Sequence, residues 1–267
     1  MPYEHIAYSV DGHIGIITIN RPDVMNALSF QTHQELARAI AQADENDEVR
    51  VIVITGSGRA FCSGDDVNDI FLNEDSPARK YQELQLGYLQ KETIEGGGSR
   101  LLTINKPTIA AVNGPAVGYG CDISLMCDIR VASEKAKFGE VFLRVGLVPD
   151  EAQLILPRLV GLAKAYELML TTDIIDAREA EKIGLVNTVV PHQELMPAAL
   201  ALARKIADKP PIAVKLTKEG VRRGLNMPIE TWKQWYSQTL LYCFTTEDHK
   251  EGARAFIEKR SPVFKGK

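Results

Sequence analysis

The sequence predicts an α/β fold in which buried strands run into loops of small residues and then into helices. Two apolar runs, Ile52 to Thr55 and Thr108 to Val112, have the length of buried strands, and each is followed by small residues. The second run leads through Gly118 and Gly120 into the mostly apolar stretch Cys121 to Met126, which is typical of a buried helix. Strands that alternate with helices in this way indicate a parallel sheet.

Taken in order, the chain opens with a predicted hairpin. Residues 3–10 and 13–20 flank Asp11 and Gly12, a pair that favours a tight turn between two strands. Residues 30–45 carry a helical pattern with an apolar inner stripe, and a strand near 50–55 follows. These segments make one β-α-β step.

The middle of the chain is less regular. Residues 66–106 are polar and are predicted to form a mobile loop and a helix. Beyond residue 128 the patterns predict a strand at 129–132 that leads to residues 136–139 and a loop ending at 147–150. Helices near 151–159 and 162–170 and a strand at 185–190 are predicted to follow.

The last third is predicted to be a helical tail. Pro191 and the pair Pro210 and Pro211 interrupt the pattern, and helical periodicity covers residues 193–207, 212–225 and 228–245. We expect a core domain of residues 1–205 and a helical region of residues 206–267.

Composition excludes several classes of function. The net charge of −4 argues against a nucleic-acid-binding surface, and no apolar run has the length of a membrane span. The first residues show no signal peptide, and the four cysteines show no CxxC spacing, so we expect reduced thiols in a cytoplasmic protein. The five histidines are scattered, and no metal site is expected.

The glycine loop before residue 121 has two possible meanings. Free amides and the helix dipole at the start of a helix favour negative charge, which points to a ligand. A tight strand-to-helix turn without a ligand explains the same glycines. The local pattern leaves both readings open.

Several linked motifs resemble the crotonase, or enoyl-CoA hydratase/isomerase, superfamily. They are the segments 20–28, 54–66, 106–121 and 127–133, together with the C-terminal stretch 251–264. The resemblance covers essentially the whole chain. It implies a crotonase-like spiral of ββα units with a C-terminal helical tail, an acyl-CoA substrate, no cofactor other than the coenzyme A carried by that substrate, and a homo-trimer or a dimer of trimers.

The same resemblance assigns binding roles. The backbone amides of Asp65 and Tyr119 would hold the thioester oxygen, which becomes negative during the reaction. An acidic side chain at position 65 must then turn away from that oxygen. The resemblance also implies substrate contacts from Met25, Ala27, Ala60, Ser63, Asp66, Val67 and Phe142.

The acid/base residues depart from the hydratase pattern. Family hydratases use two glutamates, and the matching positions here hold Asp122 and Phe142. Asp150 resembles the acid/base aspartate of crotonase isomerases, so double-bond isomerisation with Asp150 as proton shuttle is the favoured reaction. Asp150 also matches the nucleophile of chlorobenzoyl-CoA dehalogenases, but these need a histidine from the 80–105 region, which has none.

Two alternatives stay open for the function and two for single residues. The chain is an enoyl-CoA hydratase that uses Asp122 and Asp150, or it is a catalytically weak family member that binds acyl-CoA. At the level of single residues, Asp150 followed by Gln153 is also a good helix N-cap, and Asp122 is also a candidate buried structural residue.

Overall fold

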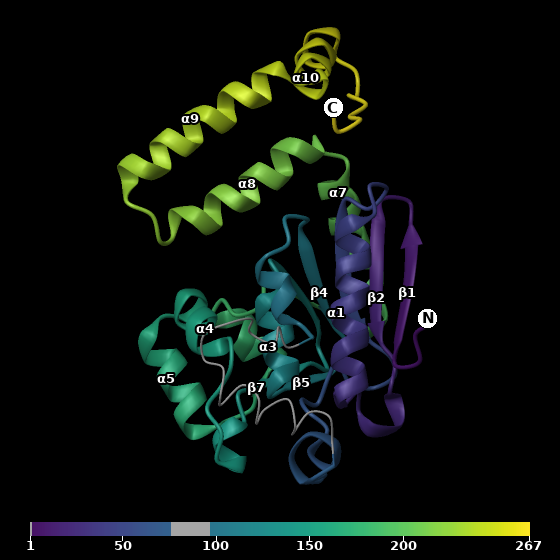
Figure 1. Cartoon of the computed structure of the whole chain (residues 1–267), viewed down its shortest axis with the longest axis vertical. Helices are drawn as coiled ribbons and strands as arrows, with labels where there is room; N and C mark the ends of the chain where they lie inside the picture. The colour runs from purple at the N-terminus through teal and green to yellow at the C-terminus, as the bar shows by residue number, and fades with distance from the viewer. Residues whose placement is uncertain (1, 76–96) are drawn as a thin grey trace.

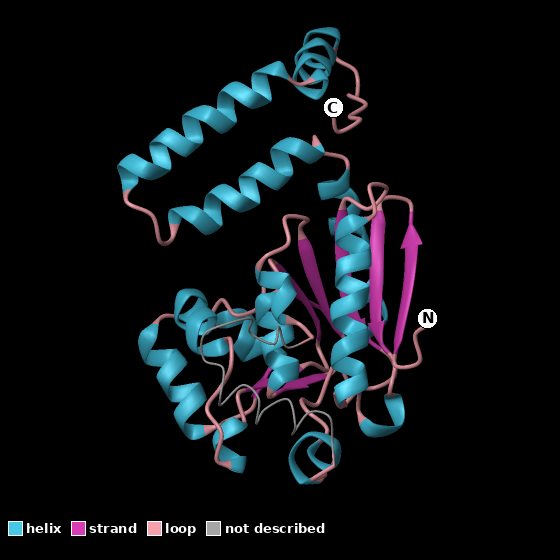
Figure 2. Cartoon of the chain, viewed as in Figure 1, coloured by secondary structure: helices cyan, strands magenta, loops and turns pink. Residues whose placement is uncertain are grey.

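The computed structural model describes residues 2–75 and 97–267, and in these residues the larger sheet has six strands in the order β1-β2-β3-β4-β6-β9. The strands are β1 (Ile6–Asp11), β2 (Ile14–Ile19), β3 (Val51–Gly56), β4 (Thr108–Val112), β6 (Ile129–Ser133) and β9 (Thr188–Val190). The first two form the predicted antiparallel hairpin, and each later pair is parallel. The carboxyl ends of β3 and β4 therefore lie at the same edge of the sheet, shown in Figure 2.

Two helices cover opposite faces of this sheet, α1 (Phe30–Glu45) and α7 (Leu195–Ala207) (Figure 1). Side chains alternate between the faces because successive residues of a strand point to opposite sides. On β3, Ile52 and Ile54 belong to the core on the α1 side, whereas Val51 and Val53 pack with α7. Because helices cover both faces of the sheet, the side chains on both sides of β3 are buried, and its sequence is a continuous apolar run.

A smaller sheet stands beside the first, with strands in the order β5-β7-β8. Its strands are β5 (Pro115–Val117), β7 (Lys137–Gly139) and β8 (Ile175–Asp176), and the helices near it are α3 (Tyr119–Met126), α4 (Ala152–Val160), α5 (Leu162–Thr171) and α6 (Ala177–Lys182). Single-turn helices occur at Pro22–Val24, Asn68–Leu72, Ser99–Leu102, Phe142–Val145 and His192–Glu194.

One buried cation closes the end of α3. Arg130, 3% exposed, donates to the carbonyl oxygens of Ser124, Leu125, Cys127 and Leu185 over 2.6–3.2 Å. These carbonyls have no partner in the last turn of a helix, so the guanidinium both satisfies them and complements the helix dipole. α3 is thereby held against β6, which carries Arg130.

Asparagine side chains hold the loop that follows β3. Asn26, in a left-handed conformation with φ 59°, donates to the carbonyls of Ser57 and Ala60. Asn113, which follows β4, donates to the carbonyls of Gly58 and Ala60. Asparagine tolerates positive φ better than most residues. The two side chains tie three chain segments into one rigid loop cluster.

The tail contains α8 (Pro211–Gly224), α9 (Ile229–Thr245) and α10 (Glu247–Glu258). α8 and α9 lie side by side and extend away from the sheets (Figure 1). A Cβ at Gly220 would lie 2.8 Å from the ring of Trp235, so the close approach of the two helices requires glycine there. α9 has no buried residue.

Most of the helices and strands predicted from the sequence have bounds close to those in the structure, and a few differ. The strand predicted at 185–190 begins only at Thr188, because Leu185 and Val186 enter the core before it. The small sheet, α6 and α10 were not predicted. The expected boundary at residue 205 falls within the last turn of α7.

Two further predictions can be compared only with the described part of the chain. Of the segment 66–106, predicted as loop and helix, residues 76–96 lie outside the described part. Among the described helices, none has the length and apolar character needed to cross a membrane.

Candidate active site

The backbone amides of Asp65 and Tyr119 lie close together. Leu28 pairs with the 64–66 segment, accepting from Asp66 N and donating to Gly64 O, each over 2.9 Å. Asp65 N is not used in that pairing, and Tyr119 is the first residue of α3, where amides have no helical partner. A Cβ at Gly64 would lie 3.6 Å from Tyr119 N. Neither amide donates to any acceptor within the described residues.

The carboxylate of Asp65 is turned toward a histidine. Its Oδ1 lies 2.9 Å from His33 Nε2, on α1, and its side chain is 17% exposed. The other ring nitrogen of His33 accepts from Gly97 N over 3.1 Å. The required turn of residue 65 away from an oxyanion is thus provided by a specific partner, which the sequence interpretation missed.

The ring of Tyr119 fills the space beside this pair. It is 4% exposed, and its centroid lies 5.1 Å from that of His33. Its hydroxyl is 3.2 Å from Ser99 Oγ, and the Ser99 hydroxyl donates to Glu151. Burial, followed by the nearby Glu151, raises the pKa of the Tyr119 phenol. The tyrosine is therefore a neutral member of a hydrogen-bonded chain that reaches the acidic residues.

Asp122, on α3, is fully buried, and its two carboxyl oxygens have different surroundings. Oδ1 accepts from the amide of Ala152, the first residue of α4, whereas Oδ2 has no partner among the described residues. Burial and the neighbouring Glu140, Glu151 and Asp150 raise its pKa well above the ordinary value. Its surroundings therefore favour the protonated form of Asp122.

Asp150 and Glu151 complete the cluster. One oxygen from each lies within 4.8 Å of the others and of an Asp122 oxygen. The predicted N-cap role of Asp150 is wrong, because α4 has no side-chain cap and Ala152 N is bound by Asp122 instead. Gln153 donates to the carbonyl of Pro149 rather than closing a capping box.

The pKa of Asp150 is raised to about 6 although its side chain is exposed in the single chain. Partial burial is the main cause, followed by the charges of Glu151 and Asp65, while His33 lowers it. A carboxyl with this pKa is mostly ionised at pH 7 yet basic enough to accept a proton. The cluster thus combines a fully buried carboxyl group and one that is exposed in the single chain.

Glu140 was missed by the sequence interpretation. It follows β7, is 2% exposed, and its carboxyl lies beside the thiol of Cys121. Burial raises the pKa of its carboxyl to about 8. A glutamate directly after the strand-like segment 137–139 was the only available signal. It stands next to Cys121 and Asp122 and adds a second neutral acid behind the cluster.

The same three carboxyls are the place where the described residues could hold a cation. Asp122, Asp150 and Glu151 each offer one oxygen. Hard cations prefer carboxylate oxygens, but the raised pKa values of Asp122 and Asp150 fit shared protons equally well.

The structure gathers most of the expected substrate-binding residues on the two loops beside the amides. Ser63 N donates to Met25 O over 3.1 Å, and the Arg59 side chain contacts Met25 Sδ at 2.8 Å. Arg21 binds both the carbonyl of Ala27 and the carboxylate of Asp66.

The other expected contacts differ in exposure. Ala60 is buried and Val67 is 46% exposed. Phe142 begins a helical turn and is packed into the main core at 7% exposure.

Comparisons with known proteins agree with this geometry. A family model described as enoyl-CoA hydratase/isomerase matches residues 10–267. The short-chain-enoyl-CoA hydratase of Clostridium acetobutylicum is 38% identical over 97% of each chain, and the crotonyl-CoA hydratase of Syntrophomonas wolfei is 37% identical over 99% of each.

Solved structures show the same fold. An enoyl-CoA hydratase from Bacillus anthracis superposes with a TM-score of 0.87 at 34% identity over 99% of this chain and 100% of that one. A putative enoyl-CoA hydratase from Streptomyces coelicolor has a TM-score of 0.90 at 32% identity, covering 100% and 96%.

The fold and site define an enzyme of the crotonase superfamily. The chain belongs to the enoyl-CoA hydratase/isomerase family.

Proposed function

We propose that this enzyme is an enoyl-CoA hydratase, which adds water across the double bond of a 2-enoyl-CoA. The observation that carries the proposal is the fully buried Asp122, which forms a cluster with Asp150 and Glu151 and has one carboxyl oxygen without a partner among the described residues. A pair of carboxyl groups with different protonation is what water addition requires. Relatives named as hydratases over the full chain support this choice over isomerisation alone.

The amides of Asp65 and Tyr119 are proposed to bind the thioester oxygen. Addition of hydroxide to the β-carbon places negative charge on that oxygen, and two fixed donors stabilise it. Each donor of this kind contributes roughly 3–4 kcal/mol in related sites. The hydrogen bond between His33 Nε2 and Asp65 Oδ1, at 2.9 Å, keeps the Asp65 carboxylate from competing for the same position.

Asp150 and Asp122 are proposed as base and acid. The ionised Asp150 takes a proton from water as the oxygen attacks the β-carbon. The neutral Asp122 then delivers its proton to the α-carbon, and proton exchange between the two carboxyls restores the starting state. Glu151 lies within 4.8 Å of both and can carry a proton in that exchange.

Isomerisation is the second candidate. Phe142 occupies the position where family hydratases have their second glutamate. Its side chain cannot carry a proton, and it is packed into the core. A single carboxyl with a pKa of about 6, as at Asp150, is sufficient to carry a proton between two carbons of an enoyl chain.

A direct assay separates these candidates. Crotonyl-CoA and a 3-enoyl-CoA are supplied to the same preparation, and water addition, double-bond migration and binding without turnover are measured separately. Hydration of crotonyl-CoA supports the proposal. Migration without hydration supports isomerisation, and binding alone leaves a catalytically weak acyl-CoA-binding protein.

We also propose that Met25, Ala27, Ala60, Ser63, Asp66 and Val67 cradle the coenzyme A portion of the substrate. These residues lie on two loops that the asparagine and arginine contacts hold together. No cofactor beyond the substrate's coenzyme A is proposed. The four cysteines are free, which fits a reducing, cytoplasmic setting.

A homo-trimer or a dimer of trimers is proposed as the assembly. α9 buries none of its residues in the single chain, and large apolar side chains on α9 and α10 are exposed, among them Leu241, Phe244 and Phe256. Exposed apolar surface of this kind marks protein interfaces. Light scattering that finds a monomer at working concentrations would contradict this assembly.

A further inference from the structure

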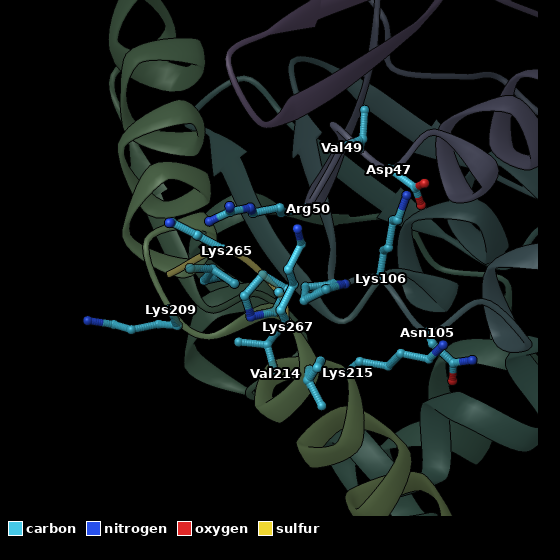
Figure 3. A pocket seen from close by; sticks show the side chains of 15 residues that line it. Asp47, Val49, Arg50, Asn105, Lys106, Lys209, Val214, Lys215, Lys265 and Lys267 are labelled. Atoms are coloured by element: carbon cyan, nitrogen blue, oxygen red, sulfur yellow. The ribbon is translucent and has the colours of Figure 1, made fainter. Parts of the chain in front are cut away.

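A basic cavity lies at the amino end of the large parallel sheet, away from the carboxylate cluster. It has a volume of about 440 Å³ and is lined where β3 and β4 begin, where α7 passes into α8, and by the C-terminal residues. Figure 3 shows its basic side chains, which are Arg50, Lys106, Lys209, Lys215, Lys265 and Lys267. We call these six residues and the space between them the basic cavity.

The charge of the basic cavity is poorly balanced. Among the described residues, Asp47 is the only acidic side chain in its lining, although the whole chain carries a net charge of −4. None of the six cations forms an ion pair with another described residue. Like charges held this close repel one another, which is unfavourable unless an anion lies between them.

Two of the cations are held in place by the fold. Lys106 Nζ donates to the carbonyls of Ala43 and Asn46 over 2.9 and 2.7 Å. Arg50 donates to the carbonyls of Ala207 and Phe264 over 3.1 and 3.0 Å. Their positive charge is therefore fixed at the wall by neutral carbonyl groups, with Asp44 and Asp47 as the acidic neighbours of Lys106.

The other four cations have no side-chain partner among the described residues. Lys209, Lys215, Lys265 and Lys267 are exposed and come from three separate segments. The cavity is also lined by Ile212 in the first turn of α8, a helix that begins without a side-chain cap. Its backbone dipole adds to the positive potential of the lysines.

We propose that the basic cavity binds a small anion with several phosphate groups. Arginine and lysine are the residues that recognise phosphate. A volume of 440 Å³ lies in the range of small-molecule sites and exceeds the needs of a single phosphate. The cations come from several segments around the wall, and this distribution suits a ligand whose negative charges lie along a chain. The concave shape and the acidic chain disfavour nucleic acid.

This site is separate from the candidate active site. The active-site loops follow the carboxyl ends of β3 and β4, whereas the basic cavity is lined by residues that precede the same strands. The proposed anion and the acyl-CoA substrate therefore bind at opposite edges of one sheet.

Titration calorimetry of the full chain at low ionic strength tests the proposal, with tripolyphosphate and ADP as separate probes. We expect one site per chain for at least one probe. Tripolyphosphate alone would identify an inorganic source, and ADP binding would identify a nucleotide. The double variant K209A/K265A should bind at least about 10-fold more weakly, because two exposed cations are removed without disturbing the core.

The double variant K182A/K233A is the matched control, since it removes two exposed lysines elsewhere on the surface. It should bind like the wild type. The proposal is overturned if neither probe binds the wild type, or if both double variants lose affinity equally, which would show only general charge attraction.

Discussion

Glu140→Gln should flatten the dependence of stability on pH. The pKa of this buried carboxyl is about 8 in the folded protein and near 4.5 when exposed. Because the folded pKa is raised, its contribution to stability is fully present below about pH 4.5 and is lost as pH rises through 8. An interval of about 3.5 pH units at roughly 1.4 kcal/mol each gives a total loss of about 5 kcal/mol. Glutamine stays neutral and avoids that loss.

Urea unfolding at pH 5, 7 and 9 measures the effect. The difference in unfolding free energy between wild type and Glu140→Gln should change by about 4 kcal/mol over this range, in favour of the variant at high pH. The constant cost of burying an amide cancels in that comparison. Glu134→Gln, at an exposed position, is the control and should run parallel to the wild type. Parallel curves for Glu140→Gln as well would refute the reasoning.

Three further predictions concern turnover of crotonyl-CoA. Asp150→Asn should lower kcat/KM by about 10²–10⁴-fold. In the wild type, kcat/KM should rise with pH through about 6, because the base must be ionised. A kcat/KM that does not change with pH in this range would count against the role of Asp150. Gly64→Ala, at φ +92° with Cβ 3.0 Å from Val117 O, should lower kcat by about 10²-fold or more, while Gly12→Ala, in open space, should not. His33→Gln should shift the acidic limb of the kcat/KM profile to higher pH, because His33 lowers the pKa of Asp150. An acidic limb at the wild-type pH would exclude an influence of His33 on Asp150.

The parts of the fold that sequence reasoning predicted are those with strong local patterns. β3 and β4 are continuous apolar runs because both faces of the sheet are covered, and this pattern is visible without tertiary information. The small sheet was missed because strands of two or three residues, such as β7 and β8, show no periodicity.

The site was predicted to a similar extent and for similar reasons. Asp122 and Asp150 were proposed from motifs and do come together. Glu140 and His33 were missed because each is a single charged or aromatic residue in an unremarkable element, and only the fold brings it to the cluster. The capping role given to Asp150 failed because a carboxylate 30 residues away in the sequence binds the amide of Ala152.

The contact between Asp122 and α4 determines where the acid can keep its proton. Oδ1 is occupied as an acceptor by the Ala152 amide, so a hydrogen on Asp122 is carried by Oδ2, which has no partner among the described residues. Half a turn of the carboxyl group would place the hydrogen-carrying oxygen against the amide of Ala152, the first residue of α4, and would weaken that hydrogen bond. The first amide of α4 thus determines which oxygen of Asp122 holds and releases the proton.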